Sequence, residues 1–91
     1  LEASVRYLAW DLGAGGIRVN AISAGPVRTA AARGIPGFQS MADAVTERTP
    51  LRREIDAADV AGAARYLASE LATNVTGETL HVDAGYHAMG L

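Results

Sequence analysis

The sequence predicts an α/β fold in the order helix, strand, loop, helix, strand. Two short β-branched segments, residues 17–23 and 78–83, are typical of strands, and a segment with helical apolar spacing precedes each of them. Strands joined through a helix are parallel and lie inside a sheet. Because two strands alone do not make a stable parallel sheet, we expect them to belong to a larger one.

The composition indicates one small globular domain and excludes several classes of function. Of 91 residues, 49% are hydrophobic and 20% are charged, so the chain can bury a core. The net charge of −2 argues against binding to nucleic acid, and no apolar run reaches the roughly 18 residues of a membrane span. Cysteine is absent, which excludes disulfides, thiolate metal sites and a cysteine nucleophile. All eight cationic residues are arginines, so lysine chemistry is excluded as well.

Residues 1–14 form a predicted helix with two opposed apolar stripes. One stripe consists of Leu1, Val5, Leu8 and Leu12, and the other of Ala3, Tyr7, Trp10 and Ala14. Both apolar faces of such a helix must be buried against another part of the structure. We expect the sheet to pack on one side and a second subunit on the other. The glycines at 13, 15 and 16 end this helix, since glycine adopts the left-handed conformation of a C-cap.

A second helix is predicted from Asp56 onward. Asp56 is placed as its N-cap, and Asp59 completes a capping box. The apolar stripe of this helix consists of Val60, Ala64, Leu67 and Leu71.

The end of the first strand is the best candidate for a binding site. The strand stops at Ala24-Gly25-Pro26, and ligands of open parallel sheets bind just beyond the carboxyl ends of strands. Backbone groups released there can pair with a planar amide, and Thr29 lies where a helix start favours phosphate. From these residues alone, an ordinary strand-to-helix turn is an equally good interpretation.

The segment between the first strand and the helix that starts at Asp56 is interrupted by Gly34, Pro36 and Gly37. Short helices are expected at 29–33 and 38–48. Long broken connections of this kind are often lids or binding loops. Its apolar residues form either minor core or the wall of an apolar ligand site; they are Ile35, Phe38 and Met41.

The two histidines look isolated in the sequence. His81 lies in a strand, where a structural role is typical, and His87 has no evident partner. Two separate imidazoles without cysteine argue against a metal site, so none is expected. Asp83 is expected to cap the turn that follows the last strand rather than to act in catalysis.

Several segments in order resemble the C-terminal third of a short-chain dehydrogenase/reductase. Residues 16–22 (GIRVNAI) and 81–85 (HVDAG) are similar to two strands of that family. Residues 23–29 (SAGPVRT) narrow the resemblance to the enoyl-acyl-carrier-protein reductases, as do residues 1–9, 49–53 and 85–87. Ala84 stands where this family usually has glycine. The resemblance implies that the chain is the C-terminal part of one Rossmann-like, doubly wound domain.

The resemblance also implies roles for individual residues. Val27 would hold the carboxamide of NADH through its backbone, and Thr29 would bond the cofactor pyrophosphate. The same wall would be lined by Arg28, Ala30 and Ala31. Residues 30–48 would be the substrate loop, with Ile35, Phe38 and Met41 facing the acyl chain.

The implied activity is the NADH-dependent reduction of trans-2-enoyl thioesters on acyl carrier protein, in a cytoplasmic homotetramer. The family's glycine-rich loop and catalytic tyrosine and lysine would precede Leu1, so no catalytic residue is assigned here. The 91 residues alone are therefore expected to be inactive. Two alternatives stay open: another reductase of the superfamily that acts on a ketone or alcohol, and a non-catalytic module that dimerises through the first helix.

Overall fold

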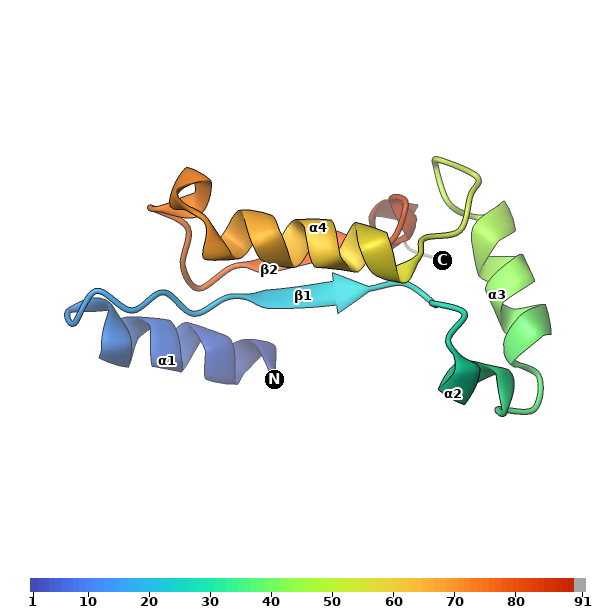
Figure 1. Ribbon diagram of the computed structural model, residues 1–91, viewed down its shortest axis with the longest axis horizontal. Coiled ribbons are helices and arrows are strands. Elements are labelled where there is room, and N and C mark those ends of the chain that lie inside the picture. Colours follow the sequence, from blue (N-terminus) through green and yellow to red (C-terminus); the bar gives the residue numbers. More distant parts are fainter. Residues whose placement is uncertain (90–91) are drawn as a thin grey trace.

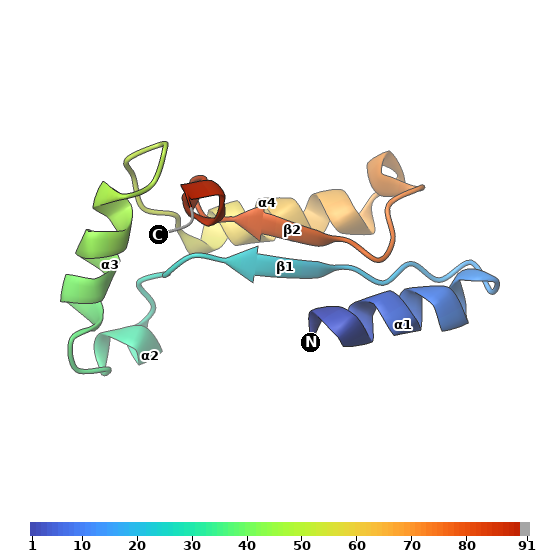
Figure 2. The same cartoon turned by 180° about the vertical axis from the view of Figure 1, so that it is seen from behind.

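A pair of parallel strands lies at the centre of the computed structural model, which describes residues 1–89 (Figure 1). Helix α4 runs along both strands, and α1 lies on the other side of β1 in both views (Figures 1 and 2). Helices α2 and α3 extend beyond the carboxyl end of β1. The elements are α1 (Glu2–Gly13), β1 (Ala21–Ala24), α2 (Ala30–Arg33), α3 (Phe38–Glu47), α4 (Ala57–Ala68), β2 (Thr79–Val82) and the 3₁₀ turns η1 (Glu70–Ala72) and η2 (Tyr86–Met89). The expected α/β order is confirmed.

Strand β1 is shorter than the segment 17–23 that the sequence predicted, because a side chain replaces part of the ladder. Its four residues pair in parallel register with β2. Just before it, the Asn20 amide donates to the Val75 carbonyl oxygen at 2.9 Å and accepts from the Glu78 N–H at 3.1 Å. These bonds join the two segments just before the ladder begins, and the Gly77 N–H adds one backbone bond to the Val19 carbonyl oxygen at 2.8 Å.

Helix α1 buries one side only in this single chain. Val5 of the first predicted stripe is buried, together with Ala9, which belongs to neither stripe. The other members of that stripe, Leu1, Leu8 and Leu12, are exposed. On the opposite stripe, Tyr7 and Trp10 are 76% and 86% exposed. The two-sided packing expected from the sequence is therefore not found within the chain, and the Tyr7–Trp10 face remains a large apolar surface.

Helix α4 begins as predicted but ends earlier. The Asp56 carboxylate accepts from the Asp59 N–H at 3.0 Å, and the Asp59 carboxylate accepts from the Asp56 N–H at 2.9 Å. The capping box is thus confirmed. The helix stops at Ser69, whose hydroxyl caps η1, so Leu71 falls outside the helix and is 83% exposed. None of the helices within residues 1–89 is long and apolar enough to cross a membrane.

The chain is more open than an independent domain of its size. Its radius of gyration is 15.2 Å, whereas about 12 Å is typical for this length. Its accessible surface is 6366 Å², against roughly 5,000 Å² for a folded monomer of this mass. Both differences agree with the expectation that this short sheet is completed by further strands and covers.

Replacing Ala84 with glycine is expected to stabilise the protein by about 0.5–1 kcal/mol. Ala84 has φ +57°, a left-handed conformation that costs a residue with Cβ about 1–2 kcal/mol. Part of the gain is lost because glycine has more freedom in the unfolded chain. Denaturant unfolding measures the change. Ala61→Gly, in the interior of α4, serves as control and should destabilise instead.

Candidate functional site

The chain passes close to the second strand as it leaves β1. The Gly25 N–H donates to the Val82 carbonyl oxygen at 3.0 Å. A Cβ on Gly25 would lie 3.4 Å from both Cα and Cβ of Asp83, so the two segments are in close van der Waals contact here. The candidate site therefore begins at the carboxyl end of the sheet, as the sequence predicted.

Val27 and Thr29 shape the turn that follows. The Thr29 N–H donates to the Val27 carbonyl oxygen at 2.9 Å, and the Thr29 hydroxyl oxygen accepts from the Ala32 N–H at 3.1 Å. Thr29 is thus the N-cap of α2, which is a single turn. Within residues 1–89 the Val27 N–H donates no hydrogen bond. Ala30 and Ala31 are exposed beside it.

Arg28 lies between two acidic side chains. Its Nε donates to the Glu54 carboxylate oxygens at 2.9 and 2.7 Å, its Nη2 donates to the same carboxylate, and Nη2 also donates to Asp43 Oδ1 at 2.8 Å. The hydrogen bonds with Arg28 hold the pKa of Glu54 below its usual value, and those with Glu54 raise the pKa of Arg28. The guanidinium therefore links the strand end to α3 and to the loop after it.

A cleft of about 550 Å³ lies beside Arg28. It is lined by Arg28, Arg33, Ile35, Pro36, Gly37, Phe38 and Gln39. Two of the three expected substrate-loop residues, Ile35 and Phe38, thus share one wall. Met41 lies outside this lining and is 45% exposed.

The segment that directly follows the substrate loop is attached to the turn after β2. Thr49 is 2% exposed, and the Leu51 N–H donates to the Ala84 carbonyl oxygen at 3.2 Å. Helix α3 buries Ala42, which is 3% exposed. The loop is therefore held firmly after α3, and its earlier part around the glycines packs less.

The histidines are not isolated, contrary to the sequence-based expectation. The imidazoles of His81 and His87 stack with centroids 3.9 Å apart, and His87 Nδ1 lies 3.0 Å from both Asp83 carboxylate oxygens. Asp83 also accepts from the backbone N–H groups of Gly85 and His87, which confirms its expected role as the cap of the turn. This turn brings residue 87 back to residue 81, and no periodicity in the sequence could indicate it.

Asp83 should give the fold a pH-dependent contribution. Partial burial acts to raise the pKa of Asp83, but the hydrogen bonds from the His87 side chain and from the two backbone N–H groups lower it overall. A lowered folded-state pKa gives stability that is present above the unfolded value of about 3.9 and is lost as pH falls through the folded value.

Asp83→Asn is accordingly expected to lose about 1–3 kcal/mol at neutral pH. The difference from the unchanged protein should shrink as the pH falls below about 4. Urea unfolding across this range measures both. A difference that stays constant with pH would show that the charge of Asp83 plays no part.

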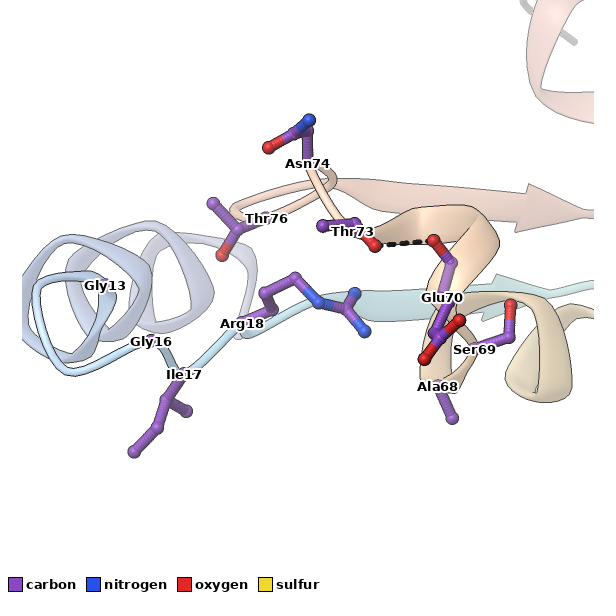
Figure 3. A pocket seen from close by; sticks show the side chains of 10 residues that line it. All are labelled: Gly13, Gly16, Ile17, Arg18, Ala68, Ser69, Glu70, Thr73, Asn74 and Thr76. Carbon is purple, nitrogen blue, oxygen red and sulfur yellow. Dashed lines mark hydrogen bonds between the residues drawn. The ribbon is translucent and has the colours of Figure 1, made fainter.

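A second hollow, of about 530 Å³, lies at the opposite end of the sheet (Figure 3). Arg18 extends into it from the segment before β1, and its Nη1 donates to the Val75 carbonyl oxygen at 3.3 Å. The hollow is at the amino ends of the strands, where ligands of open parallel sheets do not bind. The cleft beside Arg28 is therefore the better candidate.

Comparison with known proteins shows the family to which this chain is similar. The family model described as enoyl-(acyl carrier protein) reductase matches residues 1–87. The NADH-dependent enoyl-[acyl-carrier-protein] reductase of Bacillus cereus is 57% identical over 90 residues, and the NADPH-dependent enzyme of Staphylococcus aureus is 54% identical over 89. These matches cover 99% and 98% of this chain and 35% of each relative, so the chain spans about a third of their length.

Solved structures give the same result. The Bacillus cereus reductase, solved with NADP⁺ and an indole naphthyridinone, has a TM-score of 0.92 at 57% identity. The Aquifex aeolicus NADH reductase has a TM-score of 0.91 at 48% identity. In each case the match covers the whole of this chain and 35% of the chain in the solved structure. The chain belongs to the enoyl-(acyl carrier protein) reductase family, of which it contains a C-terminal part with the Rossmann-like arrangement.

Proposed function

We propose that the protein containing this chain reduces trans-2-enoyl thioesters on acyl carrier protein with NADH. The observation that carries the proposal is the family match over residues 1–87. Within it, the Val27 N–H, which has no partner among residues 1–89, and the cleft beside Arg28 lie at the carboxyl end of the sheet. Relatives named for this activity use NADH or NADPH. The chain would supply part of the cofactor wall and the substrate loop.

The strand end fits a nicotinamide cofactor. The half-buried Val27 offers an N–H without a partner inside residues 1–89, which suits a carboxamide oxygen. The Thr29 hydroxyl accepts one bond from α2 and keeps its proton to donate to a pyrophosphate oxygen. When bound, the cofactor supplies the hydride for the β-carbon of the enoyl group.

Arg28, Ala30 and Ala31 take different parts in this wall. The two alanines are exposed and small, so they let a ligand approach the backbone. Arg28 is already neutralised by Glu54 and Asp43, and it acts as a positioning residue that fixes Val27 and Thr29.

The substrate loop, residues 30–48, provides an apolar wall for the acyl chain. Ile35 and Phe38 line the cleft, and Phe38 is the first residue of α3. The Tyr7–Trp10 face of α1 is proposed as a subunit contact of a cytoplasmic homotetramer, because it is the kind of exposed aromatic surface that subunit interfaces cover.

The test is a joined protein, in which residues 1–91 replace the matching C-terminal third of the Bacillus cereus relative. We expect the joined protein to oxidise NADH with a trans-2-enoyl thioester, and residues 1–91 alone to show no activity above background. Catalytic groups that act as a unit fail together, and the chain lacks the lysine of the family pair.

The control is the joined protein in which phenylalanine replaces the catalytic tyrosine of the part that comes from the Bacillus cereus relative. A folded joined protein that binds NADH but reduces a 3-ketoacyl thioester instead would favour the other reductases of the superfamily. A folded joined protein that binds no NADH would favour the interpretation of this chain as a non-catalytic module that dimerises.

A further inference from the structure

Three potential metal ligands meet at the end of the second strand. His81 lies on β2, Asp83 follows the strand directly, and His87 lies in η2. One ligand atom from each of the three lies within 4.8 Å of the other two. Residues 81 and 83 share one face of an extended chain, and the tight turn through Ala84 and Gly85 returns His87 to the same face.

The carboxylate in this cluster is fixed in place. Asp83 Oδ1 accepts from the Gly85 N–H at 2.9 Å, and Oδ2 accepts from the His87 N–H at 3.1 Å. Its side chain is only 10% exposed. These backbone bonds fix the orientation of the Asp83 carboxylate, just as hydrogen bonds to the ligating carboxylates do in metal sites.

The imidazoles are, by contrast, able to turn. The side chains of His81 and His87 are 33% and 46% exposed, so rotation does not disturb a packed core. His87 Nδ1 lies 3.0 Å from the carboxylate, but His81 Nδ1 lies 3.9 Å from Oδ2, too far for a hydrogen bond.

A zinc-like ion fits the dimensions of this cluster after a small adjustment. Zinc–nitrogen and zinc–oxygen bonds of about 2.0–2.2 Å place tetrahedral ligand atoms roughly 3.3 Å apart. The ligand atoms lie within 4.8 Å of one another, so a tilt of the two exposed rings away from their stacked position would be enough to bring them to that spacing. Two imidazoles and one carboxylate are a ligand set that such ions prefer over Mg²⁺ or Ca²⁺.

We propose that His81, Asp83 and His87 form a binding site for a divalent transition-metal ion of the zinc class, with water in the fourth position. The ion would tie η2 to β2. The same three side chains line a hollow of about 420 Å³ together with Ser23, Gly25 and Pro26, so the ion would also brace the strand end of the candidate cofactor site. The proposal does not depend on reductase activity.

Isothermal titration of the joined protein with Zn²⁺ tests this proposal. His81 and His87 are the only histidines of the chain, and it has no cysteine, so the double variant His81→Ala/His87→Ala removes every imidazole that these 91 residues contain. We expect the unchanged protein to bind one more Zn²⁺ per chain than the double variant. Each single variant should weaken that site by at least about tenfold.

Two controls distinguish this site from general surface binding. Glu70→Gln removes an exposed carboxylate elsewhere and should leave Zn²⁺ binding unchanged. Mg²⁺ should give no heat at the site, because it prefers oxygen ligands. Circular dichroism of each variant verifies that it is folded.

A spectroscopic measurement on the unchanged protein tests the site even if a histidine variant disturbs the fold of the turn. Co²⁺ should broaden the ring resonances of both His81 and His87 in the unchanged protein. Equal Zn²⁺ stoichiometry in the unchanged protein and the double variant, or ring resonances that Co²⁺ leaves sharp, would overturn the proposal.

Discussion

Replacing Gly85 with alanine is expected to destabilise the joined protein by about 2–5 kcal/mol. Gly85 has φ +93°, a conformation that residues with Cβ rarely adopt. An added Cβ would lie 2.7 Å from Cγ and 2.9 Å from Cδ of Pro50, whose ring cannot turn away. Chemical denaturation of the variant and of the unchanged protein measures the loss.

Gly62→Ala is the matched control for this substitution. Gly62 lies inside α4, and an added Cβ there meets nothing within 4 Å. It should stabilise the protein by up to about 1 kcal/mol, because alanine has the higher helix propensity. If Gly85→Ala lowered the free energy of unfolding no more than Gly62→Ala does, the close contact between Pro50 and the turn after β2 would be contradicted.

Replacing Phe38 with alanine is expected to weaken reduction of a long-chain enoyl substrate by about 1–3 kcal/mol. Phe38 lines the cleft beside Arg28, and one apolar contact in a substrate pocket has this magnitude. In the joined protein, kcat/KM should fall about 5- to 150-fold. The affinity for NADH should change little, since Val27 and Thr29 are untouched.

Met41→Ala provides the comparison, because Met41 belongs to the same helix but lies outside the lining of the cleft. Its kcat/KM should stay near that of the unchanged protein. The opposite pattern, in which Phe38→Ala unfolds the protein and leaves kcat/KM intact, would indicate that Phe38 is ordinary core.

Local features of the fold could be predicted from the sequence because they depend on neighbouring residues. The capping box of Asp56 and Asp59 needs two residues three positions apart, and it is present with both bonds. The strand end at Ala24-Gly25-Pro26 is likewise local. Leu71 was placed in the helical stripe because spacing alone does not reveal that Ser69 ends α4 and caps the next turn.

Contacts between distant residues could not be predicted in this way. Arg28 meets Asp43 and Glu54, which are 15 and 26 positions away, and no periodicity connects them. His87 finds Asp83 through a turn that depends on the left-handed backbone of Ala84. The composition of residues 17–20 predicts strand, but the Asn20 side chain makes two of the bonds there and the regular ladder begins only at Ala21. Such contacts follow from tertiary geometry rather than from spacing.

The attachment of Thr49 and Leu51 beside the turn after β2 fixes one end of the segment that carries the substrate loop. The Arg28–Asp43 ion pair is a surface contact, so it adds only a weak restraint. Ala42 of α3 is 3% exposed, whereas Ile35 is 58% exposed. We therefore expect any opening of the cleft to involve the Ile35 end more than α3, and an acyl chain to enter from the side of α2.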